Sequence, residues 1–345
     1  MATPNEEILT YLTESPASGF AGQAVEIVDH WQGSANLLWR VNAGRQDAVL
    51  KFFLDAGQVR SRRQYDGQAL FAPYSLAPQP LWLDRIPETL PRSVLVYRWA
   101  DGEAFDAGDG YQWQTLAQAV AQIHTAAVDD MQRFSPHPVN LSYFWSVLGP
   151  SLPPLQNWLA AQGLVQLADL LARLHARGQG AVDAALPLWD QAPVAVHGDL
   201  RPDNFLSSSG SVVLLDWEMF GLGDPALETA RFLHEQRAAV SPELLEDWLD
   251  TYLNLLGDAA AQVRIDLYLR RLLPLQDAAY LLSGGMKLTA EERQSQELQD
   301  NAEFLAGTTQ QAVAEAALAL GAGDVQGDER VAAECGALFS RGISI

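Results

Sequence analysis

The chain has 345 residues, of which 22 are Lys or Arg and 43 are Asp or Glu, so its formal charge is −21. With 48% hydrophobic and 19% charged residues it can bury a large core, which excludes a disordered or fibrous protein. The acidity also argues against a nucleic-acid partner, because phosphate backbones are bound by clustered Lys and Arg.

Cys335 is the only cysteine, which excludes an internal disulfide framework and a cysteine zinc cage. The first residues lack the basic and apolar pattern of a signal peptide. No window reaches the roughly 18 consecutive apolar residues that a membrane span needs. We therefore expect a reduced, soluble, cytoplasmic protein with no membrane or nucleic-acid partner.

Short apolar runs dominate the first hundred residues and predict five strands: Val25–Trp31, Leu37–Val41, Ala48–Leu54, Leu81–Leu83 and Ser93–Trp99. The turn-rich stretch 32–36 favours a hairpin between the first two. One helix is predicted at Gln58–Phe71, although Gly67 weakens its pattern. The segment 100–110 is rich in glycine and acids, as a linker between lobes would be.

Helical periodicity follows this linker and predicts six helices: Trp113–Ala127, Leu155–Arg177, Asp224–Gln236, Pro242–Leu256, Val263–Leu282 and Glu291–Leu320. Between them, 194–217 is predicted as a strand, a polar loop and a second strand. Periodicity is weak after Gly321. We expect an α+β protein with a small β-sheet lobe over 1–100, a hinge at about 96–103, a larger helical lobe over 104–320 and a tail over 321–345.

The polar loop and the strand after it carry the residues that could take part in catalysis. Asp199 and Asn204 lie in the loop, and Asp216 ends the next apolar run, so these side chains are expected to converge. Phosphoryl transfer needs such a set: one Asp to accept or orient the proton of an attacking hydroxyl, and oxygen ligands to hold Mg²⁺ against phosphates.

The stretch HGDLRPDN at 197–204 and the stretch LLDWE at 214–218 resemble motifs of the aminoglycoside phosphotransferase and choline kinase group of small-molecule kinases. This resemblance implies a bilobal protein-kinase-like fold with an antiparallel N-lobe. It extends over roughly 20–285. Gly at the second motif position, and Trp-Glu after the last Asp, point away from protein kinases.

The resemblance assigns roles to the loop residues. Asp199 is implied to be the catalytic base, and Asn204 and Asp216 to be the magnesium ligands. Arg201 is expected to neutralise charge on the transferred phosphoryl group. His197 is expected to brace the loop rather than to shuttle protons.

The nucleotide site is implied by three further matches. The turn containing Gly33, Ser34 and Asn36 resembles the nucleotide loop of this family, where backbone N–H groups approach phosphates. Lys51 is one cation in an apolar strand, and its burial favours an anionic partner such as the nucleotide phosphates.

The third match is the hinge, where the backbone of Val96, Tyr97 and Trp99 is expected to face the adenine edge. One departure concerns the helix Glu that pairs with the strand lysine in kinases. The helix here contains no Glu, and Asp66 is the nearest acidic candidate to support Lys51.

These observations predict an ATP-dependent kinase, with GTP as the alternative donor and Mg²⁺ as cofactor, acting on a hydroxyl of a small molecule as a monomer or homodimer. The acids of 218–250 suit an amine-bearing acceptor such as an aminoglycoside or amino alcohol, but the outward acids of ordinary amphipathic helices in so acidic a chain explain them better. The main alternative is a non-catalytic kinase-like nucleotide-binding protein. A second is a metal-dependent hydrolase using His197, Asp199 and Asp216.

Overall fold

The computed structural model describes residues 4–33, 35–128, 131, 134–208 and 210–340. The chain divides into two compact units whose segments alternate. Unit 1 comprises Met1–His137, Val194–Pro225 and Ala239–Gly257, and unit 2 comprises Pro138–Pro193, Ala226–Ala238 and Asp258–Ile345. All predicted site residues belong to unit 1, except that Ser34 lies outside the described residues.

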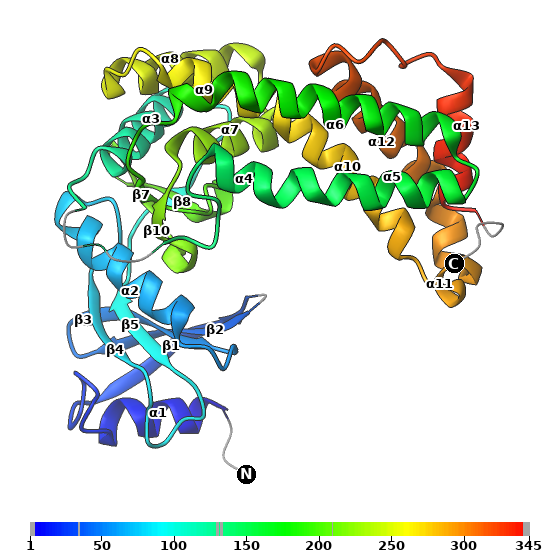
Figure 1. The fold of residues 1–345 in the computed structure, drawn as a ribbon. Coiled ribbons are helices and arrows are strands. Elements are labelled where there is room, and N and C mark those ends of the chain that lie inside the picture. Colours follow the sequence, from blue (N-terminus) through cyan, green and yellow to red (C-terminus); the bar gives the residue numbers. More distant parts are fainter. Residues whose placement is uncertain (1–3, 34, 129–130, 132–133, 209, 341–345) are drawn as a thin grey trace. The chain divides into compact units, whose positions relative to one another are not determined.

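Unit 1 is built on an antiparallel five-stranded sheet with the strand order β1-β2-β3-β5-β4 (Figure 1). Its strands are β1 Val25–Gln32, β2 Asn36–Ala43, β3 Gln46–Phe53, β4 Pro80–Asp84 and β5 Val94–Arg98. Each coincides with a predicted apolar run to within two residues. The predicted antiparallel sheet is therefore confirmed.

Strand β3 contributes to a different core on each face of the sheet, because successive side chains of a strand alternate. Ala48, Leu50 and Phe52 belong to one cluster. Helix α1 (Pro4–Glu14) covers that face with Ile8, Tyr11 and Leu12, on the side opposite helix α2 in Figure 1. The sequence patterns did not predict α1. Val49 and Phe53 belong to the other cluster, and Lys51 lies between them in register.

Helix α2 (Val59–Phe71) confirms the helix predicted at 58–71, and its glycine has a packing role. A Cβ placed on Gly67 would lie 2.8 Å from the indole of Trp217 and 2.9 Å from Phe220. One turn later, Phe71 stacks on Trp217 with ring centroids 5.0 Å apart. Gly67 therefore allows α2 to lie against the segment that follows Asp216, which brings the helix close to the candidate site.

The remainder of unit 1 contains helices α3 (Gly110–His124) and α8 (Pro242–Leu256), which agree with two predicted helices. They pack together, and buried His124 Nδ1 lies 2.6 Å from the Tyr252 hydroxyl. Five short strands complete the unit: β6 Glu103–Ala104, β7 Val194–Val196, β8 Phe205–Ser208, β9 Ser211–Leu214 and β10 Gly221–Gly223.

Unit 2 is helical in its described residues and contains α4 Leu141–Leu148, α5 Leu152–Ala161, α6 Val165–Ala185, α7 Pro225–Gln236, α9 Ala261–Leu267, α10 Leu273–Lys287, α11 Ala290–Gln294, α12 Gln296–Ala319 and α13 Glu329–Leu338. A π-helical turn, Tyr268–Leu272, joins α9 to α10. None of the described helices combines the length and the apolar character that crossing a membrane requires.

Two predicted helices of unit 2 are each divided in the structure. The single helix expected at 155–177 is interrupted after α5, where Gly163 has a φ of +77°, a conformation that favours glycine. The helix expected at 291–320 is interrupted at Ser295, whose extended backbone begins α12 and whose hydroxyl accepts from the Leu298 N–H.

Candidate active site

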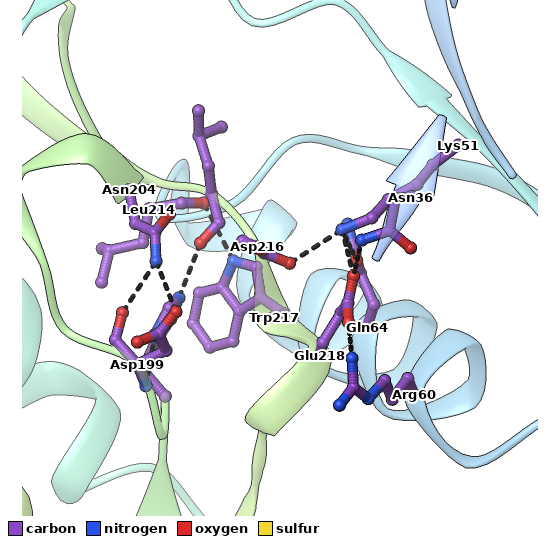
Figure 2. Close-up of polar contacts among 12 residues, drawn as sticks. Asn36, Lys51, Arg60, Gln64, Asp199, Asn204, Leu214, Asp216, Trp217 and Glu218 are labelled. Carbon is purple, nitrogen blue, oxygen red and sulfur yellow. Dashed lines mark hydrogen bonds and ion pairs between the residues drawn. The ribbon is translucent and has the colours of Figure 1, made fainter. Parts of the chain in front are cut away.

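Strand pairing brings the predicted loop residues together. Strands β8 and β9 pair with Phe205 opposite Leu214, and the Leu215 N–H donates to the Asn204 carbonyl at 2.8 Å. Asn204 and Asp216 therefore occupy adjacent positions at one end of this hairpin. Figure 2 shows the Asp216 side chain drawn between the pair Asp199 and Asn204 and the cluster around Lys51.

Asp199 is held by its neighbours in the loop. Its Oδ2 accepts from Arg201 Nη2 at 2.6 Å and from Asn204 Nδ2 at 3.0 Å, and its carbonyl accepts from the same amide at 2.9 Å. The Asp199 side chain is 25% exposed, so solvent and small molecules reach it. Two donors thus orient a carboxylate that can accept a proton.

His197 is buried and ties the loop to the strand before Asp216. A carbonyl only accepts, so the contact of 2.9 Å with the Leu215 carbonyl places the proton on His197 Nε2. The other nitrogen, Nδ1, is then free to accept from the Asp199 N–H at 3.3 Å. This is the geometry that a brace of the loop requires.

Gly198 has a φ of +88°, and a Cβ there would collide with the Met219 carbonyl. The side chain that protein kinases carry at this motif position therefore has no room in this loop. The positive φ would also strain any other residue.

Lys51 lies at the centre of a buried polar cluster. Its side chain is 4% exposed, and Nζ donates to Gln64 Oε1 at 2.8 Å and to Asp216 Oδ1 at 2.8 Å. A third acceptor, Glu218 Oε1, lies at 2.5 Å. The buried ammonium therefore meets two carboxylates, the kind of anionic partner that its position in an apolar strand predicts, and one uncharged amide.

Glu218 connects this lysine to two further elements. Its Oε1 also accepts from Asn36 Nδ2 at 2.6 Å, and its Oε2 lies 3.6 Å from Arg60 Nη1 (Figure 2). Sequence reasoning did not assign Gln64 or Arg60 to the site, and it counted Glu218 only among the acids that suit an amine-bearing acceptor. The signal for Glu218 was its place two residues after Asp216, whereas Gln64 carries no charge to mark it.

The structure places Gln64, rather than Asp66, at the lysine. Two residues turn a helix by about 200°, so a helix that directs Gln64 toward Lys51 directs Asp66 to a different side. The predicted supporting role of Asp66 is therefore wrong. The helix contributes an uncharged amide, and the acidic partners of Lys51 come from the segment 216–218.

The charges of this cluster alter two pKa values. Partial burial by itself raises the pKa of Asp216, but the charge of Lys51 and its hydrogen bond outweigh this effect and hold the pKa below its ordinary value. Burial raises the pKa of the Tyr97 hydroxyl, and the negative charges of Asp216 and Glu218 raise it further. Asp216 is therefore ionised and Tyr97 neutral at physiological pH.

The hinge differs from its prediction. Val96 and Tyr97 lie inside β5, where the backbone pairs with β3 on one side and β4 on the other. The Arg98 N–H donates to the Gln79 carbonyl at 2.8 Å, and the Trp99 N–H donates to the Asp47 carbonyl at 3.0 Å. The expectation that the backbone of 96–99 is open to an adenine edge is thus not met at these N–H groups.

The predicted nucleotide turn joins β1 to β2. The Gly33 N–H donates to the Asn36 carbonyl at 2.9 Å, which closes the turn. A Cβ on Gly33 would find its nearest neighbour at 3.7 Å, so the chain itself leaves room for a side chain there. The chain itself therefore does not require glycine at position 33, and the approach of phosphates to the backbone of this turn stays a prediction.

The oxygen donors at 204 and 216 fit a magnesium ion. Both hydrogen bonds donated by Asn204 use Nδ2, which leaves Oδ1 as the atom able to bind a cation. Asp216 is ionised, and its side chain is 37% exposed. A site with few protein oxygens suits Mg²⁺, which takes its other ligands from phosphates and water. The described residues hold no cluster of three or more His, Cys, Asp or Glu arranged to bind a metal.

Comparison with solved structures identifies the fold. Aminoglycoside phosphotransferase APH(2'')-Ib in its ADP-bound form aligns with a TM-score of 0.58 at 13% identity, over 93% of this chain and 99% of that one. A choline/ethanolamine kinase family protein from Mesorhizobium loti aligns with a TM-score of 0.55 at 17% identity, over 98% and 99%. These similarities confirm the predicted protein-kinase-like fold.

A thermostable mutant of aminoglycoside phosphotransferase APH(4)-Ia, in a ternary complex with AMP-PNP and hygromycin B, aligns with a TM-score of 0.54 at 16% identity, over 85% of this chain and 95% of that one. The search of curated proteins finds no match. The family model of the phosphotransferase enzyme family matches residues 26–265, well over half of the chain. The chain therefore belongs to the phosphotransferase enzyme family and is a small-molecule phosphotransferase with a protein-kinase-like fold.

Proposed function

We propose that this enzyme transfers the terminal phosphoryl group of ATP to a hydroxyl of a small molecule. The observation that carries the proposal is the assembly of Asp199, Asn204 and Asp216 on one hairpin and its preceding loop, with Lys51 bonded to Asp216. A proton acceptor, two cation ligands and a phosphate-binding cation are the parts that phosphoryl transfer requires.

Asp199 acts on the acceptor. Its carboxylate takes the proton of the acceptor hydroxyl as the new oxygen–phosphorus bond forms and the bond between the terminal phosphorus and the bridging oxygen of ADP breaks. Asn204 and Arg201 hold the carboxylate in place. Arg201 is exposed enough to turn toward the transferred phosphoryl group and to offset its charge.

Lys51 and the Gly33 turn act on the nucleotide. The buried ammonium binds the inner phosphates, and backbone N–H groups near Gly33 approach the outer ones. Asn204 and Asp216 would hold Mg²⁺, whose charge offsets that of the phosphate oxygens.

The missing helix Glu was the observation that favoured a non-catalytic protein. Lys51 has an acidic partner in Glu218 instead, which supports a catalytic protein. A hydrolase built on His197 is disfavoured, because both ring nitrogens of His197 are engaged with the backbone.

Two observations support a proposal for the class of acceptor. Acids on α8, including Glu243, Asp247 and Asp250, are exposed and attract amines. One structural neighbour is complexed with hygromycin B, and another belongs to the choline/ethanolamine kinase family. We therefore propose an amine-bearing alcohol as the first acceptor class to screen, with cytoplasm as the location, in keeping with the free, buried Cys335.

A screen for ADP release across amines, amino sugars and amino alcohols tests the proposal. With the best acceptor, Asp199→Ala should lower turnover by about 10²–10⁴-fold and leave ATP binding intact. Asp203→Ala, which removes an exposed acid of the same loop, is the matched control and should retain turnover. Wild-type turnover in Asp199→Ala contradicts the assignment. ATP binding without transfer to any acceptor supports the non-catalytic alternative.

A further inference from the structure

The lysine of this site takes its acidic support from an unusual place. Helix α2 offers Lys51 only the amide of Gln64, whereas Glu218 offers a carboxylate at 2.5 Å. We propose that Glu218 is a positioning residue that holds Lys51 for the nucleotide phosphates, in place of the glutamate that α2 lacks. This inference rests on the proposed function and specifies how its nucleotide side works.

All three N–H donors of Lys51 are used by protein acceptors, so a nucleotide must displace one of these acceptors. An ammonium has three N–H donors, and Gln64, Asp216 and Glu218 accept all three. A phosphate oxygen can bind Lys51 only after one acceptor leaves. The Asp216 side chain is 37% exposed and that of Glu218 is 8% exposed, so Asp216 is the partner that can turn away.

Glu218 is also the partner that the surrounding protein fixes. Its Oε1 accepts from Asn36 in β2, and its Oε2 faces Arg60 in α2. A carboxylate cannot donate, so the Asn36 amide must present Nδ2 to it. This leaves Asn36 Oδ1 buried without a partner among the described residues, a cost of about 1–3 kcal/mol. The contact between Asn36 and Glu218 is thus made in spite of that cost.

The balance of charge supports the same division of roles. Two cations, Lys51 and Arg60, face two carboxylates in this cluster. When Asp216 turns to other ligands, Glu218 still neutralises Lys51 and keeps the ammonium from being buried without a counter-charge. The Glu218 carboxylate thus anchors the lysine both before and after nucleotide binding.

The first test measures nucleotide affinity by calorimetry in Glu218→Gln. The loss of a positioning partner should weaken ATP binding by about 10–100-fold. Adenosine, which has no phosphates for Lys51 to bind, should bind as in wild type. The ATP measurement is made in EDTA, so that a metal-ligand role of Glu218 predicts no loss there. Glu88→Gln, an exposed acid of unit 1, is the matched control.

The second test moves the acid to the helix. Gln64→Glu places a carboxylate at the α2 position that already meets Lys51, so the double variant Gln64→Glu with Glu218→Gln should recover ATP affinity. If Glu218→Gln does not fold, the double variant is compared with Gln64→Glu alone, and equal affinity is the supporting result.

Several results overturn the inference. If ATP affinity is unchanged in Glu218→Gln, or does not recover in the double variant, the positioning role of Glu218 is wrong. The proposed function is not affected by either result. Weaker binding of both ATP and adenosine shows that Glu218 maintains the whole pocket and also contradicts it. A wild-type protein that binds no ATP overturns the proposed function, and the inference with it.

Discussion

The lysine side and the aspartate side of the candidate site are built in opposite ways. The Lys51 side chain is 4% exposed, and its acceptors come from two segments, helix α2 and residues 216–218. The side chains of Asp199 and Arg201 are 25% and 54% exposed, and the Asp199 carboxylate accepts from Arg201 and Asn204 of its own loop. The groups that would bind a common nucleotide are locked in the protein, whereas those that would meet a variable acceptor remain open to solvent.

The largest effect on stability should come from removing the charge of Lys51, at the centre of the buried cluster. Lys51→Met keeps the length of the side chain and removes the charge, which leaves Asp216 and Glu218 without their shared cation. The free energy of unfolding, measured by urea denaturation, should fall by about 3–5 kcal/mol. A second substitution, Glu218→Gln, should restore part of this loss because it removes one uncompensated charge. A Lys51→Met protein as stable as wild type would show that this cluster is not a buried charge network.

The second prediction concerns the loss of stability at low pH. Because Lys51 holds the pKa of Asp216 below its ordinary value of 3.8, unfolded chains take up this proton before folded ones do. The stability contributed by ionised Asp216 is complete above that ordinary value and is lost as the pH falls through the lower folded value. Asp216→Asn should therefore flatten the acid limb of the curve of stability against pH. An unchanged acid limb would mean that the pair does not persist in solution.

The smallest effect on stability should come from the exposed loop that contains Asp199 and Arg201. Arg201→Ala removes an exposed ion pair with Asp199, and such pairs contribute about 0–1 kcal/mol. The melting temperature should hardly change, while turnover with the best acceptor should fall. A large loss of stability instead would show that Arg201 supports the loop rather than the reaction, and would remove the contrast between the two sides.

The sequence predicted most of the sheet and the catalytic loop because their signals are local. Strands such as β3 alternate apolar residues between bounded turns, and the spacing from Asp199 to Asn204 is fixed along the chain. Helix α1 was missed because its buried apolar residues, Ile8, Tyr11 and Leu12, make only a short stripe. Gln64 was missed because its role depends on a contact with Lys51 that only tertiary packing creates. The choice between Asp66 and Glu218 as the lysine's acid depends likewise on which side of α2 faces the sheet.

Gly67 gives the position of α2 a simple steric basis. The helix lies as near to Trp217 as a residue without a Cβ permits, and Gln64 is less than one turn away on the same helix. An added methyl group at position 67 would act as a wedge, lifting the amide of Gln64 from the ammonium without altering any polar atom. The distance between Gln64 and Lys51 therefore depends on how closely α2 can approach the indole of Trp217.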